Sequence, residues 1–248
     1  YYNYRGIYGD TGNSPSNQYN NGYATPFATV MTCGTGDFDN GNSQSEEFVK
    51  LGSVNNPEGA VAAVGLSTTG THTAYNNILD MGIYDGIFSK KLWYAGAAEA
   101  NGDLAMLATY PSNPSGATEA FIAWSNLIGD PALHLWTGVP ADFAVDHIDV
   151  ISLGSTTTDI IVYNQDGNTV ADARVTLLMG DDIIFTTGLT DQNGEITLSW
   201  EAVASGSMYI TIIKQDYRPY EGVIEISPAS GAAVAMNSGI LEVSSGEA

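Results

Sequence analysis

Two short apolar runs in the first half of the chain have the pattern of buried strands. The first covers residues 27–32 and is closed by Cys33 and Gly34; the second covers 60–66. Both runs are bounded by glycine or proline and are too short for a helix. A polar loop, 67–72, follows the second run. We therefore expect two neighbouring strands, each ending in a loop that carries polar side chains.

The segments between and after these two runs have the apolar spacing of helices. Ser43 and Glu46 have the spacing of a capping box, which predicts a short helix that Gly52 ends. Apolar residues then recur at helical spacing over about 75–88, 92–107 and 117–127, and 133–136 is predicted to return as a strand. This order of strands and helices predicts an α/β fold with a mostly parallel sheet flanked by helices.

From about residue 140 the pattern changes to short strands and turns. Asp166-Gly167 and Asn193-Gly194 favour tight turns between strands. Strands are predicted at 160–163, 174–178, 183–186, 196–198, 208–213 and 223–226. Short strands at this spacing predict a β-sandwich. We expect one domain at 1–138, the sandwich at 139–228, and a tail or the start of a further strand pair at 229–248.

The net charge of the chain excludes two classes of binding partner. The 248 residues include 7 basic and 28 acidic side chains, a formal net charge of −21. Such a chain repels nucleic acid phosphates and anionic lipid, so neither is an expected partner. No apolar stretch approaches the roughly 18 residues of a membrane span. The chain begins at Tyr1 without a leader-like segment, which indicates a processed product or a fragment.

Cys33 is the candidate nucleophile. As the only cysteine it forms no internal disulfide and no Cys-rich zinc site. It follows the first predicted strand, at the sheet edge where α/β folds place their ligand crevice. Gly34 and Gly36 leave the backbone there uncluttered, so nearby amides can face a substrate oxyanion. The alternative is a buried thiol with a packing role.

A cysteine nucleophile needs a base, because the thiolate is the attacking form. His72 follows the second predicted strand, and loops after parallel strands open on the same edge, which allows His72 to meet Cys33. The alternative is a solvated loop histidine. His134 and His147 lie on or near predicted strands, which favours structural roles for both.

An acidic loop follows Cys33 and raises the question of calcium. Its oxygen-bearing side chains are those of Asp37, Asp39, Asn40 and Asn42. Alternating oxygen ligands suit calcium, but the distal glutamate of an EF-hand loop is missing, and a simple acidic turn is favoured. We predict no metal site and no required cofactor, and leave a structural calcium ion open.

Three segments of this chain resemble the gingipain-type cysteine peptidases, which are caspase-like. They are 28–38, around Cys33; 59–68, the second strand run; and 128–133, with the sequence Ile-Gly-Asp-Pro-Ala-Leu. The resemblance implies that 1–138 is the C-terminal portion of a caspase-like catalytic domain and that the sandwich is immunoglobulin-like. It also implies that Ser67 and Thr68 line the substrate pocket.

The implied activity is that of a secreted or bacterial cell-surface hydrolase. A cysteine endopeptidase of this kind cleaves proteins or peptides through a thioester acyl-enzyme, and an upstream fragment of the same precursor is a possible partner. Family members carry their catalytic histidine in Asn-Tyr-x-Gly-His-Gly, but here Ile7 stands in its place. This leaves His72 as the candidate base, with the amides of Cys33 and Ile7 as candidate oxyanion donors.

The missing histidine supports a second hypothesis. The chain is then a catalytically degenerate peptidase scaffold that acts as a cell-surface adhesin or as a structural subunit of an assembly.

Overall fold

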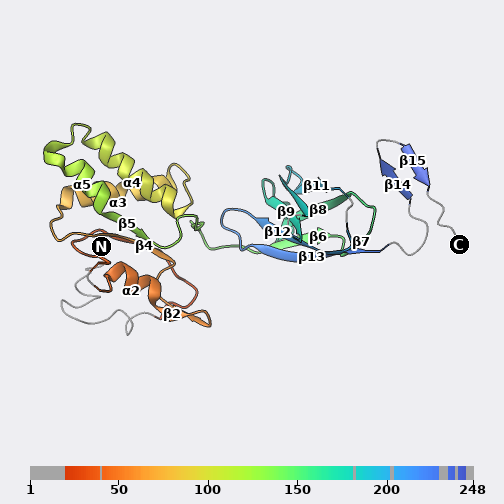
Figure 1. Ribbon diagram of the computed structural model, residues 1–248, viewed down its shortest axis with the longest axis horizontal. Helices are drawn as coiled ribbons and strands as arrows, with labels where there is room; N and C mark the ends of the chain where they lie inside the picture. The colour runs from red at the N-terminus through yellow and green to blue at the C-terminus, as the bar shows by residue number, and fades with distance from the viewer. Residues whose placement is uncertain are drawn as a thin grey trace. The chain divides into compact units, whose positions relative to one another are not determined.

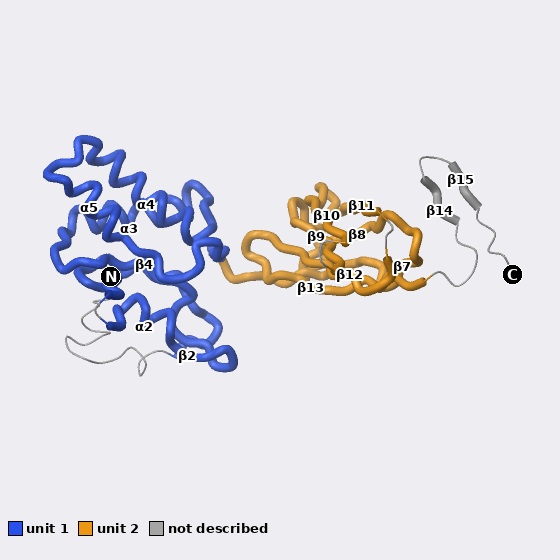
Figure 2. The backbone as a smooth tube through the Cα atoms, viewed as in Figure 1, with its two compact units in different colours: residues 1–137 blue, residues 138–248 orange. Residues whose placement is uncertain are grey.

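The computed structural model describes residues 20–39, 41–180, 183–201, 204–228, 234–237 and 240–243. The chain forms two compact units, residues 1–137 and residues 138–248 (Figure 2). Each unit has a hydrophobic core of its own. In the described part of the chain, no helix is both long enough and apolar enough to cross a membrane.

A three-stranded sheet is the centre of unit 1. Its order is β1-β4-β5, with bounds β1 (Phe27–Val30), β4 (Ala62–Leu66) and β5 (Ser125–Ile128). Every residue of β4 is buried, because β4 is the middle strand and both of its faces are covered. The two apolar runs of the sequence are thus the parallel pair β1 and β4, which confirms that part of the prediction.

The sheet is mixed rather than mostly parallel, because β5 runs antiparallel to β4. Helix α5 (Ala117–Trp124) ends beside the carboxyl end of β4, where the Ser67 amide donates to the Trp124 carbonyl at 2.9 Å. The strand that follows therefore starts where β4 ends and runs back along it. The expected extension of this helix to residue 127 is wrong for the same reason.

The expected strand at 133–136 is also wrong. This segment forms one isolated bridge, between His134 and Tyr94, and does not join the sheet. The Leu135 amide donates to the Trp93 carbonyl at 2.6 Å, and the Leu135 side chain is buried in the core between the sheet and its helices. The apolar residues at 133–136 thus reflect the burial of Leu135 in the core. The backbone there is extended and pairs with the residues just before α4, not with a strand of the sheet.

Helices cover both faces of the sheet (Figure 1). Helices α3 (Thr73–Phe88), α4 (Ala95–Thr109) and α5 lie on one face, and a short 3₁₀ turn, Pro114–Gly116, precedes α5. On that face Val64 of β4 packs with Ile83 and Ala98 of the helices. Helix α2 (Gln44–Lys50) lies on the other face, followed by the small hairpin β2 (Gly52–Ser53) and β3 (Asn56–Pro57).

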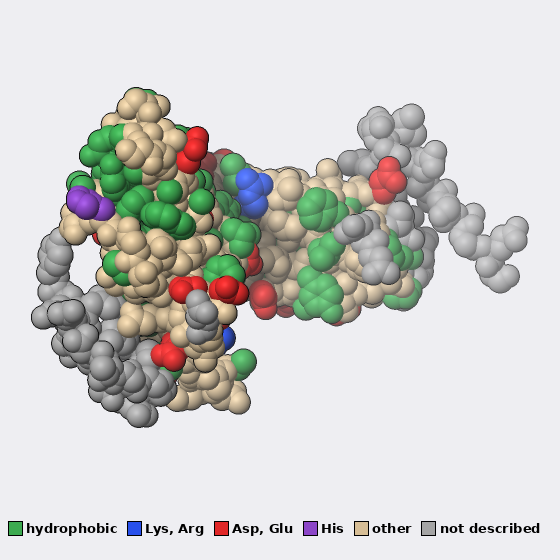
Figure 3. Space-filling view, turned by 60° about the vertical axis from the view of Figure 1, so that its left-hand side comes forward, with side chains coloured by type: hydrophobic (Ala, Val, Ile, Leu, Met, Phe, Trp, Pro, Cys, Tyr) green, Lys and Arg blue, Asp and Glu red, His purple; other side chains and the backbone are tan. Residues whose placement is uncertain are grey.

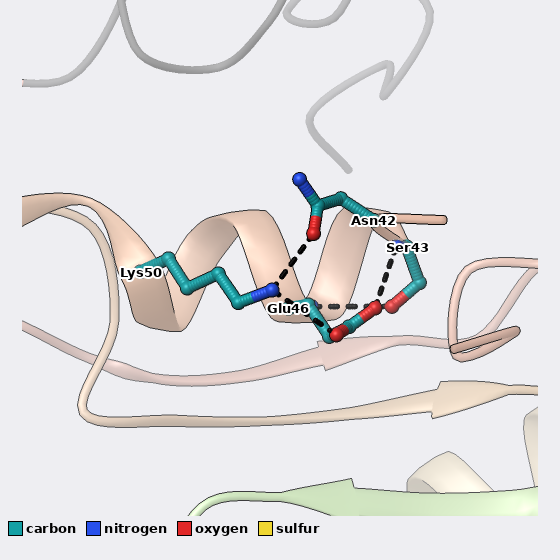
Figure 4. Close-up of polar contacts among 4 residues, drawn as sticks. All are labelled: Asn42, Ser43, Glu46 and Lys50. Carbon is teal, nitrogen blue, oxygen red and sulfur yellow. Dashed lines mark hydrogen bonds and ion pairs between the residues drawn. The ribbon is translucent and has the colours of Figure 1, made fainter. Parts of the chain in front are cut away.

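Helix α2 begins at the predicted capping box (Figure 4). The Ser43 hydroxyl accepts from the Glu46 amide at 3.2 Å, and the Ser43 amide donates to the Glu46 carboxylate at 2.8 Å. The hydrogen bond from the Ser43 backbone amide holds the pKa of the Glu46 carboxyl below its ordinary value. Lys50, one turn on, donates to Glu46 at 3.2 Å and to Asn42 at 2.7 Å. The box sets where α2 starts, and Phe48 is then buried against Val30 and Ala60.

Unit 2 consists of two sheets that share one core. The strands are β6 (Phe143–His147), β7 (Val150–Ser152), β8 (Thr157–Asn164), β9 (Arg174–Met179), β10 (Ile184–Leu189), β11 (Glu195–Ser199), β12 (Gly206–Ile213) and β13 (Tyr220–Ser227). They form the sheets β10-β9-β12-β13-β7 and β11-β8-β6. Ile160 and Val162 of the smaller sheet belong to the same buried cluster as Leu177 and Ile210 of the larger one. The immunoglobulin-like topology stays a prediction.

A last strand pair follows β13 in the sequence. β14 (Val234–Asn237) and β15 (Ile240–Val243) pair antiparallel, within the segment 229–248.

Candidate active site around Cys33

Cys33 lies on a tight turn directly after β1. The buried Thr35 holds this turn, since its hydroxyl contacts the Val30 and Thr32 carbonyls, the second at 2.9 Å. The Cys33 side chain itself is exposed. A buried packing thiol, the alternative left open by the sequence, is therefore wrong.

The loop after β4 runs beside this turn. The Gly34 amide donates to the Thr68 carbonyl at 2.8 Å, and the Gly36 amide donates to the Leu66 carbonyl at 3.0 Å. The expectation that the two loops meet at one edge of the sheet is thus correct. The same bonds occupy the amides of Gly34 and Gly36, which leaves the amides of Cys33 and Ile7 as the candidate oxyanion donors.

Thr71 is the side-chain partner of the thiol. Its Oγ1 lies 3.0 Å from the Cys33 Sγ. Asn76, in the first turns of α3, donates from Nδ2 to the Thr71 Oγ1 and to the Met31 carbonyl, both at 3.2 Å. Sequence reasoning missed Thr71 and Asn76. One signal was available, because Asn76 is a polar residue three positions before the core residue Leu79, and a buried polar group needs partners.

This arrangement favours the thiolate. A hydrogen bond from the Thr71 side chain, then one from the Thr71 backbone, lowers the pKa of Cys33, and the Cys33 backbone adds a smaller lowering. Partial desolvation acts in the opposite direction and is outweighed. Thr71 also directly precedes His72, the N-cap of the 16-residue helix α3. The partial positive charge of a helix N-terminus stabilises a nearby thiolate.

His72 is exposed and is engaged by its own helix. Its Nδ1 accepts from the Ala74 amide at 3.2 Å. The ring also lies edge-on to Tyr75, with ring centroids 5.8 Å apart. His72 follows Thr71, the partner of the thiol, directly in the chain. The hydrogen bonds found among the described residues nevertheless do not join His72 to Cys33. A neutral ring that accepts at Nδ1 carries its proton on Nε2.

The other predicted site residues are distributed as follows. Ser67 and Thr68 are half-buried beside the Cys33 turn, and the Thr68 hydroxyl accepts from the Gly70 amide at 3.3 Å. Ile7 lies outside the described residues. His134 contacts Tyr94, with ring centroids 5.2 Å apart. His147, in unit 2, lies 2.9 Å from the Tyr220 hydroxyl.

The acidic loop after Cys33 has no metal-binding cluster that the described residues reveal. Among those residues, no three His, Cys, Asp or Glu side chains are grouped to hold a metal ion. Of the four residues considered for calcium, Asn40 lies outside the described part.

Acidic side chains outnumber basic ones on the face that Figure 3 shows, in keeping with the net charge of −21.

A family model matches the part of the chain that holds this site. The model is that of Peptidase family C25, and the match covers residues 4–136, more than half of the 248 residues. The match includes β1, the Cys33 turn, β4, the loop with Thr71, and the helices that follow. No curated protein matches the sequence.

Solved structures of peptidases have a similar fold. The crystal structure of the Arg-specific cysteine proteinase gingipain R (RgpB) gives a TM-score of 0.67 at 20% identity, covering 86% of this chain and 46% of that one. A complex of the pro- and mature domains of RgpB from Porphyromonas gingivalis gives 0.59 at 19% identity, covering 86% and 48%. A third structure, named only as a protease, gives 0.59 at 16% identity, covering 81% and 47%. The chain thus spans about half the length of the structures that it matches.

Proposed function

This chain belongs to peptidase family C25, and we propose that it performs cysteine-peptidase chemistry with Cys33 as the nucleophile. The observation that carries the proposal is the exposed thiol at the end of β1, with its Sγ 3.0 Å from the Thr71 hydroxyl. Reactive cysteines have accessible thiols whose pKa is lowered by their surroundings, whereas structural cysteines are buried. Cys33 matches the first description, because it is exposed and hydrogen bonds lower its pKa.

In the proposed reaction, the Cys33 thiolate attacks the carbonyl carbon of a peptide bond. A carbon–sulfur bond forms, the carbon–nitrogen bond breaks, and the amine leaves with a proton. Water then attacks the thioester, which releases the acid and restores the thiol. The amides of Cys33 and Ile7 are the candidate donors to the oxyanion, and Ser67 and Thr68 are the candidate pocket residues.

His72 is the candidate for the proton transfers, on one condition. Accepting a proton requires a free lone pair, and in the neutral ring that lone pair is on Nδ1, which accepts from the Ala74 amide. His72 therefore acts as a base only when its ring leaves the helix cap. Loss of a single cap bond costs about 1 kcal/mol of stability, which is small beside the cost of an unassisted proton transfer.

Partners and location follow from the same family. We propose a protein or peptide substrate and a secreted or cell-surface location. We also propose that an upstream fragment of the same precursor binds this chain, because the chain covers only 46% of the gingipain R structure and a pro-domain complex is known for RgpB.

The test is a pair of assays on the same protein. Iodoacetamide labelling followed by mass spectrometry measures the thiol, and a peptide library with every residue before the scissile bond measures cleavage. We expect labelling at Cys33 between pH 6 and 8, and cleavage that Cys33→Ala abolishes. A thiol that stays unlabelled over this range, or cleavage that survives Cys33→Ala, contradicts the proposal.

The second candidate function, a degenerate peptidase scaffold in a surface assembly, is favoured by two observations. Ile7 stands where the family motif has histidine, and the ring of His72 caps α3. This candidate predicts that no library peptide is cut and that Cys33→Ala leaves attachment or assembly unchanged. It also predicts that His72→Asn, which keeps a capping side chain, has no effect on assembly.

A further inference from the structure

We propose that Thr71 and Asn76 are positioning residues for Cys33: the Asn76 amide orients the Thr71 hydroxyl, which donates its proton to the Cys33 sulfur and stabilises the thiolate. The inference rests on the proposed role of Cys33 as nucleophile. It concerns the reactivity of the thiol, however, and is measured without any substrate.

The direction of each hydrogen bond follows from the chemistry of the groups. The Met31 carbonyl only accepts, so the nitrogen of the Asn76 amide faces it. The same nitrogen lies 3.2 Å from the Thr71 Oγ1, which therefore accepts from Asn76. A hydroxyl has one hydrogen, and that hydrogen is left to point at the sulfur 3.0 Å away. The chain of donors runs from Asn76 through Thr71 and ends on Cys33.

Asn76 joins helix α3 to two other segments of unit 1. The residue is 8% exposed, and its Nδ2 donates both to the Met31 carbonyl, just before the Cys33 turn, and to Thr71 in the loop after β4. Its Oδ1 is buried and has no hydrogen-bond partner among the described residues. A residue that served packing alone at this position would avoid an unpaired buried oxygen, because an apolar side chain removes that penalty. The Asn76 Nδ2 instead donates to the Thr71 hydroxyl, the side-chain partner of the thiol.

Among the residues that the structure describes, few other charged groups lie near the thiol. His72 is next to Thr71, Asp37 and Asp39 are in or just after the Cys33 turn, and Asp80 of α3 lies against Thr29 of β1. The N-terminus of α3 adds a partial positive charge one residue beyond Thr71. A hydroxyl that donates to sulfur changes the thiolate fraction directly, whereas these groups remain the same when Thr71 is replaced.

The experiment measures the rate of alkylation of Cys33 by iodoacetamide from pH 5 to pH 10. Thr71→Val keeps the shape of the side chain and removes the donor. We expect its rate at pH 7 to fall at least threefold, because the apparent pKa of the thiol rises, and its rate at pH 10 to equal or exceed that of the unmodified protein. Thr71→Ser, which keeps the hydroxyl, restores the rate, and Asn76→Leu lowers it in the same direction as Thr71→Val.

The matched control is Thr69→Val, an exposed threonine of the same loop, which leaves the whole profile unchanged. Circular dichroism and thermal unfolding confirm that each variant is folded. An unchanged profile for Thr71→Val overturns the proposal, as does a loss of rate that is equal at pH 7 and pH 10, because the latter indicates altered access rather than an altered pKa.

The peptide assay separates this inference from the proposed function. If no peptide is cut and Thr71→Val still shifts the alkylation profile, the positioning role stands and the peptidase proposal fails. If peptides are cut by Cys33 and Thr71→Val shifts nothing, the peptidase proposal stands and the positioning role fails.

Discussion

Gly36 and Gly65 touch through their backbones. A Cβ atom added at Gly36 would lie 2.6 Å from the carbonyl carbon and oxygen of Gly65, and one added at Gly65 would lie 2.7 Å from the Gly36 nitrogen. Both distances are well below van der Waals contact, and the atoms that would be hit are backbone atoms that cannot rotate away. This contact determines how closely the Cys33 turn approaches β4. It therefore also determines the distance between Cys33 and the loop that carries Thr71.

Gly36→Ala is therefore expected to destabilise unit 1 by about 1–3 kcal/mol, because the turn or β4 must move to admit the methyl group. The same movement is expected to slow alkylation of Cys33 at pH 7. Denaturant unfolding and the labelling rate measure the two effects. Gly70→Ala is the control, since the nearest atom to its added Cβ is 3.8 Å away. Equal stability of the two variants would show that the close approach does not constrain the turn.

Ser43→Ala is expected to lower the stability of unit 1 by about 1 kcal/mol. The substitution removes the hydroxyl that accepts from the Glu46 amide and so opens the capping box of α2. Urea unfolding measures the change. Ser112→Ala, an exposed serine in the same unit, should change stability by less than about 0.5 kcal/mol. A Ser43→Ala protein as stable as the Ser112→Ala protein contradicts the prediction.

Glu99 and Asp103 of α4 make unit 1 sensitive to pH. Desolvation, with repulsion from Asp103 second, raises the pKa of Glu99 from 4.5 to about 7, and desolvation raises that of Asp103 from 3.8 to about 6. The Ser125 hydroxyl donates to Glu99 at 3.4 Å and offsets a part of the shift. Between about pH 4 and 7 these two carboxyls bind more protons in the folded unit than in the unfolded chain, so their contribution to the free energy of unfolding falls as the pH rises.

Glu99→Gln is expected to remove part of this dependence. Both carboxyls are partly exposed, so we expect the variant to gain about 1–2 kcal/mol relative to the unmodified protein at pH 8 and little at pH 4. Urea unfolding at the two pH values measures the difference. Glu119→Gln, at an exposed position of α5, removes the same charge as a control. If both variants gain equally at pH 8, the effect comes from net charge and not from burial of Glu99.

Ile210 and Ile213 test the core of unit 2 from the same strand. Ile210 is fully buried between the two sheets, whereas Ile213 is 43% exposed on the other face of β12. Ile210→Ala is expected to destabilise unit 2 by about 2–5 kcal/mol, and Ile213→Ala by less than about 1 kcal/mol. Calorimetry of the full chain follows the melting of unit 2. Similar losses for the two variants contradict the assignment of the core.

Signals within a few residues of one another were enough to predict most elements. The capping box at Ser43 and Glu46 places the start of α2, and Asp166-Gly167 and Asn193-Gly194 mark turns that the structure contains. The two apolar runs became β1 and β4, and the change to strand periodicity near residue 140 corresponds to a two-sheet unit. These features depend on backbone preferences and on burial of one face, which are local properties of a sequence.

Only the tertiary structure decided the rest. The direction of β5 depends on where α5 ends relative to β4, and the extended segment around Leu135 pairs with the approach to α4 because of that packing. The sequence pointed to Cys33 and to the loop after β4, but it suggested His72 as the partner, whereas the sulfur meets Thr71. Cys33 and Thr71 are 38 positions apart, and no periodicity shows which side chain of a loop turns toward a distant thiol. That choice is made by Asn76 and by the contact of Gly36 with Gly65, which exist only once the chain is folded.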